Sequence, residues 1–194
     1  MPKTLILIAH TQAQGSRGGV LEDKYYKLSK VGIKQAREVG RLLKAKTCTP
    51  QQAVCSTALR AKQTLEFIRQ EIDIANKNIS FNNMLYLCAT TYKAQPGLSE
   101  ALFRKIICPK AKAIDDLMIV GHAWTIGGFM ADRIVFRLNE RDFSRYMTAV
   151  EDYHYRGGKV IILSAKASSW EGVFDEKKEK AIKLEEVWVP EKEG

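Results

Sequence analysis

Residues 5–15 read LILIAHTQAQG, a short apolar run that ends in a histidine and passes into small and polar residues. A continuous apolar run of this length is typical of a strand buried on both faces of a parallel sheet. A second such run, LMIVGH at 117–122, also ends in a histidine. Ligands bind beyond the carboxyl ends of parallel strands, so we expect His10 and His122 to face one crevice if the two strands are neighbours.

Strand patterns alternate with helical patterns along the rest of the chain. Buried strands are predicted at 5–8, in a short run near Val54, at 117–120 and at 160–163. Helices with one apolar face are predicted after the N-cap Ser29 (Ile33, Ala36, Gly40, Leu43), at Ala61, Leu65, Ile68 and Ile72, after Ser99 (Leu102, Phe103, Ile106, Ile107), and from Thr125 to Ile134. This alternation predicts an α/β fold, a three-layer αβα sandwich with a mostly parallel central sheet.

Length and composition favour a single domain over residues 1–194. The chain is 45% apolar, which is enough for one full core. The segment DEKKEKAIKLEE at 175–186 is strongly charged, and we expect it to be a solvated face or linker. Lysine and arginine number 31 against 22 acidic residues, a formal charge of +9 that favours anionic partners. Nucleic acid is not expected, because no binding motif and no basic run interleaved with aromatics is present.

The cysteines and the N-terminus bear on cofactor and compartment. Cys48, Cys55, Cys88 and Cys108 are widely spaced, without a C-x-x-C pair or a nearby histidine, so we expect free, mostly buried thiols and no zinc or redox site. No signal peptide pattern and no apolar run of about 20 residues is visible. The expectation is a cytoplasmic protein without membrane contact or cofactor, and its oligomeric state does not follow from the sequence.

A third polar group follows the strand near Val54. The segment CSTALRAKQT at 55–64 places Arg60 in the first turn of the next helix, where a guanidinium beside backbone amides suits a phosphate. The amides that open the helix after His122, beginning with Ala123, are a second candidate. Phosphoryl transfer could then proceed without a metal, by attack of a neutral imidazole, while Arg60 and a protonated second imidazole stabilise the charge.

Four segments carry a resemblance to a known family. They are LILIAHT at 5–11, LSKVGIKQA at 28–36, CSTALRAKQT at 55–64 and VGHAWT at 120–125. In this order they resemble the Arg-His-Gly, L-T-x-x-G-x-x-Q-A, S-S-P-x-x-R-A-x-Q-T and V-G-H motifs of the histidine phosphatase superfamily, the phosphoglycerate-mutase-like proteins. The resemblance runs from about Leu5 to about Leu163, and the compact length is most similar to the small SixA-like phosphohistidine phosphatase branch.

The resemblance implies a role for each of three residues. His10 is implied to be the nucleophile that becomes phosphorylated, Arg60 a phosphate clamp, and His122 the second histidine of the pocket. It also implies a phosphohistidine side chain or a small phosphorylated metabolite as substrate, and no cofactor. A mutase would need more pocket-forming insertions than this chain offers.

Three positions depart from the family pattern. Arg-His-Gly reads Ala9-His10-Thr11 here, so an arginine of the phosphate pocket is missing, and such a loss can cost about 3 kcal/mol, on the order of a hundredfold in rate. NNMLYL at 82–87 lacks the glutamate that many members use as general acid, which favours substrates with a good leaving group. Thr11 replaces glycine where backbone approaches phosphate, and we expect its side chain to crowd the pocket.

Two interpretations of function therefore stay open. One is an active phosphatase working through His10; the other is a catalytically impaired member that binds phosphorylated ligands or a protein partner. If the pocket is active, another cation is needed to replace the missing arginine. Arg17 in the GSRGG loop at 15–19, Lys24 and Lys27 are the candidates that the sequence offers.

Overall fold

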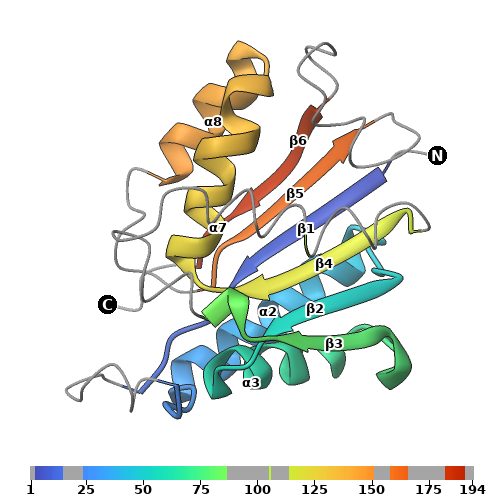
Figure 1. The fold of residues 1–194 in the computed structure, drawn as a ribbon, viewed down its shortest axis with the longest axis vertical. Coiled ribbons are helices and arrows are strands. Elements are labelled where there is room, and N and C mark those ends of the chain that lie inside the picture. The colour runs from blue at the N-terminus through green and yellow to red at the C-terminus, as the bar shows by residue number, and fades with distance from the viewer. Residues whose placement is uncertain are drawn as a thin grey trace.

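One six-stranded sheet forms the centre of the molecule (Figure 1). The computed structural model describes residues 3–14, 24–86, 105, 114–150, 158–165 and 182–190. The strands are β1 (Lys3–Ala9), β2 (Gln52–Ser56), β3 (Ile79–Asn82), β4 (Asp116–Gly121), β5 (Val160–Ala165) and β6 (Ile182–Trp188), in the order β3-β2-β4-β1-β5-β6. β1, β2, β3 and β4 pair in parallel, and β5 and β6 are antiparallel to their neighbours. The predicted α/β architecture with a mostly parallel sheet is confirmed.

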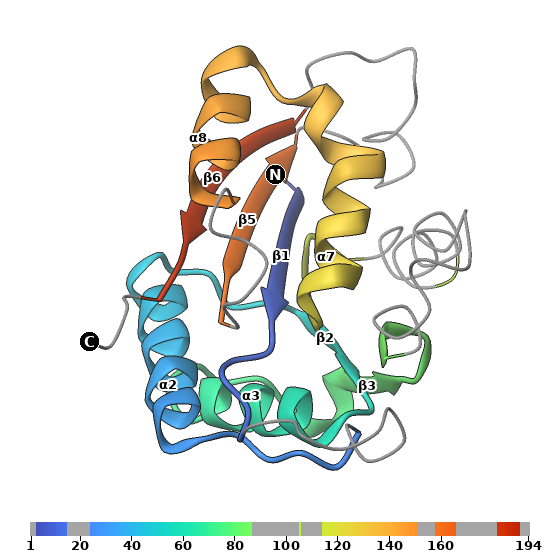
Figure 2. The same ribbon diagram turned by 90° about the vertical axis from the view of Figure 1, so that its left-hand side faces the viewer.

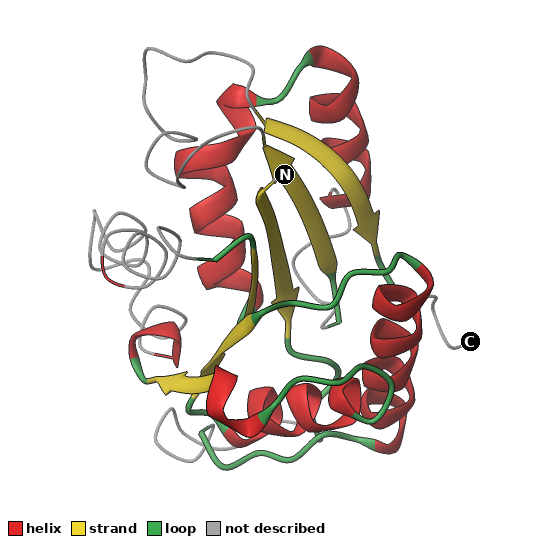
Figure 3. Cartoon of the chain, turned by 90° about the vertical axis from the view of Figure 1, so that its right-hand side faces the viewer, coloured by secondary structure: helices red, strands yellow, loops and turns green. Residues whose placement is uncertain are grey.

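Helices cover both faces of this sheet. The longer ones are α2 (Lys30–Ala45), α3 (Leu59–Arg69), α7 (Ala123–Phe129) and α8 (Glu140–Val150), with short turns at Asn76–Asn78, Met130–Ile134 and Val135–Arg137. The two side views show the central strands lying between α7 on one side and α2 on the other (Figures 2 and 3). Among the described residues, no helix is both long and apolar enough to cross a membrane.

The strand β1 contributes to the cores on both faces of the sheet. Leu5, Leu7 and Ala9 pack with residues of α7 and α8, whereas Ile6 and Ile8 pack with residues of α2 and α3. All five side chains are almost completely buried. A strand enclosed on both faces needs apolar residues at every position, which is why this segment shows no alternation with polar residues.

The predicted helices are found where the structure describes them. Ser29 caps α2 by accepting a hydrogen bond from the Gly32 amide at 3.0 Å, as expected for an N-cap serine. α3 ends at Arg69, so Ile72 lies beyond the helix although it is still buried. The helix predicted from Thr125 begins two residues earlier, at the start of α7. The helix predicted after Ser99 lies outside the described residues.

Three elements were not predicted, namely β3, α8 and β6. The strand β6 corrects the expectation for the charged segment, because residues 182–186 are part of an edge strand. Within it, Ile182 and Leu184 are buried and alternate with exposed Lys183 and Glu185. This is the period of a strand with one solvated face, which a window of mixed charge conceals. Residues 175–181 lie outside the described part of the chain.

The described cysteines are free thiols. Cys55 in β2 is fully buried, and Cys48 is half-buried. Burial raises the pKa of both thiols, which keeps them in the unreactive protonated form. The expectation of free, mostly buried cysteines is confirmed for these two, and Cys88 and Cys108 lie outside the described residues.

Candidate active site

The two predicted histidines lie side by side at one end of the sheet. β1 and β4 are neighbours, and their carboxyl ends lie beside the start of α7 (Figure 1). The His10 amide, just after β1, donates to the Gly121 carbonyl at 2.9 Å, and His122 is the N-cap residue of α7. The ring centroids of His10 and His122 are 5.0 Å apart, with the rings at 72°. The predicted proximity of the two imidazoles is confirmed.

Hydrogen bonds define which nitrogen of His10 carries the proton. Nδ1 lies 2.8 Å from the Thr11 carbonyl oxygen, and Nε2 lies 2.9 Å from Nε of Arg60. A carbonyl can only accept and a guanidinium can only donate, so the proton belongs on Nδ1 and Nε2 presents its lone pair. This is the arrangement that a histidine nucleophile requires, with one nitrogen held by backbone and the other available.

His122 is buried and has the opposite tautomer. Its Nδ1 lies 3.3 Å from Nη2 of Arg60, and its Nε2 lies 2.9 Å from the Ser56 hydroxyl. Because arginine can only donate, Nδ1 accepts and Nε2 donates to Ser56. Burial lowers the pKa of His122 well below its usual 6.5, and the nearby His10 and Arg60 lower that pKa further. The protonated second imidazole expected from the sequence is therefore not the form that this environment favours.

Arg60 lies between the two imidazoles. It occupies the first turn of α3, as predicted, and its side chain is buried. The amides around it have protein acceptors, because the Leu59 amide donates to the Lys24 carbonyl at 2.9 Å and the Ala58 amide donates to the Ser56 hydroxyl at 3.3 Å. These hydrogen bonds occupy two of the amides at this helix start, and a share of the backbone amides in phosphate binding stays a prediction. The guanidinium of Arg60 contacts both imidazoles, and its predicted role as a phosphate clamp stays a prediction.

Thr11 is hydrogen-bonded to the helix that carries Arg60. Its side chain is fully buried, its amide donates to the Thr64 hydroxyl at 3.1 Å, and the two hydroxyl oxygens are 3.2 Å apart. The Thr64 hydroxyl itself donates to the Arg60 carbonyl at 2.8 Å, so the Thr11 hydroxyl is the donor between the two threonines. This threonine joins the loop of His10 to the helix of Arg60, and the expected crowding of a bound phosphate stays a prediction.

Tyr86 forms one wall beside His122. The two ring centroids are 5.7 Å apart at an angle of 62°, and the tyrosine is buried. Lys24 lies over the tyrosine ring, with its Nζ 6.0 Å from the centroid. Of the candidate replacement cations, Lys24 is thus near this wall, Lys27 is exposed, and Arg17 lies outside the described residues.

The turn after β3 packs against the turn that precedes Arg60. The Asn83 side-chain oxygen accepts a hydrogen bond from the Thr57 hydroxyl at 2.7 Å, and the Met84 amide donates to the Asn82 side chain at 2.8 Å. Residues 82–86 contain no carboxylate, so this turn brings amide groups, and no general acid, toward the site.

The structure brings together at the site several residues for which no role was predicted. His122 is contacted by the Ser56 hydroxyl and by the Tyr86 ring. The Arg60 carbonyl accepts a hydrogen bond from the Thr64 hydroxyl. Ser56 and Thr64 stand inside the quoted CSTALRAKQT segment, so the motif was a signal for them. The Ala123 amide is confirmed at the start of the helix after His122, and its role in phosphate binding stays a prediction.

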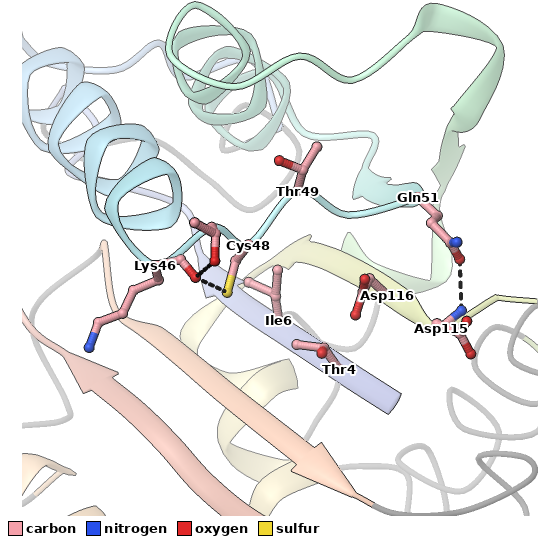
Figure 4. Close-up of a pocket in the computed structure, with 9 residues that line it drawn as sticks. Thr4, Ile6, Lys46, Cys48, Thr49, Gln51, Asp115 and Asp116 are labelled. Atoms are coloured by element: carbon pink, nitrogen blue, oxygen red, sulfur yellow. Dashed lines mark hydrogen bonds between the residues drawn. The ribbon is translucent and has the colours of Figure 1, made fainter. Parts of the chain in front are cut away.

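A separate pocket of about 340 Å³ lies at the other end of the sheet (Figure 4). It is lined by Thr4, Ile6, Lys46, Thr47, Cys48, Thr49, Gln51, Asp115 and Asp116. These residues include neither a histidine nor an arginine, so the pocket does not offer the chemistry of the histidine site. Within the part of the chain that the structure describes, no three histidine, cysteine or carboxylate side chains gather in a way that could hold a metal ion.

Two adjacent strand-end histidines bridged by a buried arginine, on a mostly parallel sheet covered by helices, define a histidine-phosphatase-like α/β protein. Residues 5–80 match the sequence model of the histidine phosphatase superfamily (branch 1). The matched residues contain three of the four motifs that carry the resemblance, and the fold over the length of the chain is similar to that of solved histidine phosphatases. A search of curated proteins gave no significant match.

Solved structures of similar fold include SixA proteins. A protein assigned as the phosphohistidine phosphatase SixA from Nakamurella multipartitia is 20% identical, with a TM-score of 0.67 over 98% of this chain and 97% of that one. Its counterpart from Agrobacterium tumefaciens is 18% identical, with a TM-score of 0.67 over 98% and 99%. The protein histidine phosphatase SixA in complex with tungstate is 14% identical, with a TM-score of 0.57 over 96% of each chain. At these identities the likeness establishes the fold.

Proposed function

We propose that this protein is a phosphatase that transfers a phosphoryl group first to Nε2 of His10 and then to water, without a metal ion. The observation that carries the proposal is the orientation of His10. Its Nδ1–H is held by the Thr11 carbonyl, and its Nε2 lone pair faces the Arg60 guanidinium. A neutral imidazole so held is a competent nucleophile toward phosphorus.

In the first step the Nε2–P bond forms as the bond from phosphorus to the leaving group breaks. The leaving group departs with the bonding electron pair and takes up a proton. Arg60 exchanges its hydrogen bond to Nε2 for bonds to the phosphoryl oxygens, whose charge it offsets in the transition state. Because one guanidinium contacts both imidazoles, the phosphoryl group would lie between His10 and His122.

In the second step water attacks the phosphorus of the phosphohistidine. The N–P bond breaks, inorganic phosphate leaves with the oxygen of the water, and His10 regains its lone pair. An anionic phosphoryl group next to Nδ1 of His122 favours protonation of that imidazole, opposing the effect of burial. His122 would therefore acquire its charge on substrate binding, with Ser56 keeping the ring oriented.

The substrate class proposed is a phosphohistidine side chain or a small phosphorylated metabolite. The absence of a carboxylate in residues 82–86 supports substrates whose leaving group needs little protonation, such as phosphoramidates and aryl phosphates. The names of two similar structures, a phosphohistidine phosphatase and a protein histidine phosphatase, support the same choice. A phosphoprotein is the corresponding partner.

A second candidate function is supported by Ala9, which stands where the family motif has arginine. A pocket that has lost this cation could bind phosphorylated ligands, or a protein partner, without turnover. Arg60 and both histidines would serve such a binding site as well as a catalytic one, because a fold can outlast its chemistry.

The test is hydrolysis of an aryl phosphate in the presence of a chelator, with rapid quenching to trap acid-labile phosphate on the protein. We expect turnover and a phosphoprotein burst in the wild type. His10→Ala should lose the burst and reduce the rate by about a thousandfold or more, with its fold verified by thermal unfolding. An inert wild type that still binds phosphate in an Arg60-dependent way would establish the binding function instead, and persistence of turnover in His10→Ala would refute the mechanism.

A further inference from the structure

Lys159 lies directly across from Ala9 in the sheet. The Ala9 amide donates to the Lys159 carbonyl at 3.0 Å, and the Gly158 amide donates to the Ala9 carbonyl at 3.2 Å. Two residues of one strand thus face a single residue of β1, which is a β-bulge. Gly158 has a φ of 89°, a conformation that favours glycine at this position of the bulge. The bulge stands at the start of β5, beside the loop that carries His10.

The register places the Lys159 side chain on the same face of the sheet as Ala9. Leu7 pairs with Ile161, and both belong to the core beneath α7, as does Ala9. Val160 belongs to the opposite core, beneath α2 and α3. Successive side chains of a strand alternate between faces, so Lys159, one residue before Val160, lies on the α7 face. That face borders His122, the N-cap residue of α7.

The side chain of Lys159 is buried, with only 2% of its surface exposed. Lysine is among the residues least often found fully buried, because removing an ammonium group from water is costly. The Cβ atoms of residues that face each other across a strand pair are about 4.5–5.5 Å apart. This is within the reach of a lysine side chain, and the side chain opposite is only the methyl group of Ala9. The ammonium group can therefore occupy the space that a long side chain at position 9 would fill.

We propose that Lys159 is a phosphate-binding residue that supplies, from β5, the positive charge that the family's Arg-His-Gly motif supplies from β1. The proposal rests on the proposed function of the histidine site and names a residue of its phosphate pocket. It makes Ala9 and Lys159 a matched pair, in which the small residue on one strand accommodates the long cation on the next. The replacement of the motif arginine by Ala9 then moves the positive charge from β1 to the start of β5, and the pocket keeps it.

Lys159 is better placed for this role than Lys24 and Lys27, the two suggested cations that the structure describes. Lys24 contacts the Tyr86 ring, with its Nζ 6.0 Å from the centroid, and Tyr86 in turn contacts His122. Lys27 is exposed. Only Lys159 is hydrogen-bonded through its backbone to Ala9, the position of the missing arginine.

The test is tungstate binding, measured by calorimetry on the wild type and on seven variants of the full chain. Lys159→Met should weaken binding by about tenfold or more, the usual cost of losing a charged hydrogen-bonding partner. Lys159→Arg, which keeps the charge, should stay within a few fold of wild type. Lys24→Met should have a smaller effect than Lys159→Met. Lys44→Met, which removes an equal charge from the exposed end of α2, is the matched control and should bind as wild type does.

Two variants at position 9 test the pairing directly. Adding Ala9→Arg to Lys159→Met should restore most of the lost affinity, because it returns the cation to β1. Ala9→Arg alone should bring no gain, since it would place a second cation and a large side chain beside Lys159. Wild-type affinity in Lys159→Met, or a tenfold gain from Ala9→Arg alone, would overturn the proposal.

These outcomes separate the proposal from the function on which it rests. One possible result is that wild type binds tungstate, that Arg60→Ala abolishes this binding and that Lys159→Met leaves it unchanged. In that case only the proposed role of Lys159 is wrong. If wild type does not bind tungstate at all, the proposed function fails with it. Should Lys159→Met not fold, Lys159→Arg and Ala9→Arg still decide, because a large loss in the first or a large gain in the second contradicts the proposal.

Discussion

Arg60 decides the proton positions of both site histidines. Since a guanidinium can only donate, each imidazole must turn a lone pair toward it, and each then needs its own partner for the remaining N–H. Thr11 provides a carbonyl for His10 and Ser56 provides a hydroxyl for His122. One buried arginine therefore prepares the proposed nucleophile, while burial, with smaller contributions from His10 and Arg60, lowers the pKa of the second imidazole and keeps it neutral. The same group would bind the phosphoryl oxygens, so it would serve both before and during the proposed reaction.

The depressed pKa of His122 predicts a loss of stability in mild acid. Burial lowers this pKa in the folded protein, so below about pH 6.5 the unfolded chain binds a proton that the folded protein does not. The free energy of unfolding should therefore be unaffected by His122 above pH 6.5 and should fall as the pH drops below it, by up to about 1.4 kcal/mol per pH unit.

Urea unfolding at pH 7.5, 6.5 and 5.5 measures this, with His122→Gln as the comparison. Subtracting the variant's pH dependence from that of wild type removes the contribution of every group the two proteins share. If the free energy of unfolding changes equally between pH 6.5 and 5.5 in the two proteins, His122 is not the cause of the change.

At the scale of elements, α2 positions the loop of His10 through a glycine. A Cβ at Gly32 would lie 2.0 Å from the Gln12 carbonyl oxygen, so the helix start and this loop are in close backbone contact. The Ser29 side chain also donates to the Gln12 side chain at 2.9 Å. A second helical glycine, Gly40, makes a comparable close approach, but to α3 and the residues after it.

These two glycines predict different effects of the same substitution. Gly32→Ala should displace Gln12 and the adjoining His10, lowering stability and weakening tungstate binding by several fold. Gly40→Ala should also lower stability, by about 1–3 kcal/mol for an overpacked contact, yet leave tungstate affinity unchanged because its clash lies away from the site. Calorimetry and urea unfolding of both variants measure the two effects, and unchanged tungstate affinity in Gly32→Ala would contradict this account.

In the whole molecule, the proposed nucleophile follows the most enclosed strand of the sheet. β1 is paired on both edges, with β4 and β5, and is covered on both faces. β3 lies at an edge of the sheet and is only partly buried. A catalytic group held at the end of a rigid central strand needs little reorganisation before reaction.

Amide hydrogen exchange should reflect this arrangement. The amides of Ile6 and Leu7 in β1 are expected to exchange only through global unfolding, whereas those of β3 should exchange through local opening, on the order of a hundredfold faster or more. Exchange followed by NMR under native conditions measures both, and equal protection of the two strands would show that the sheet opens as one unit.

The sequence by itself determined the local features of this protein. Continuous apolar runs predicted β1 and β4, the histidines after them marked the end of the sheet where the site lies, and CSTALRAKQT placed Arg60 at a helix start. These predictions succeed because each of them depends on a few neighbouring residues. β6 was missed because its alternation is masked by charge, and α8 because no pattern was recognised there.

Only the tertiary structure decided the features that join distant parts of the chain. The neutral state of His122 results from burial, and the hydrogen bond of Thr11 to Thr64 joins a loop to a helix far along the sequence. The placement of Lys159 opposite Ala9 follows from strand register and a single bulge at Gly158. Register is set by the pairing of whole strands, so no local stretch of residues encodes which side chains will share a site.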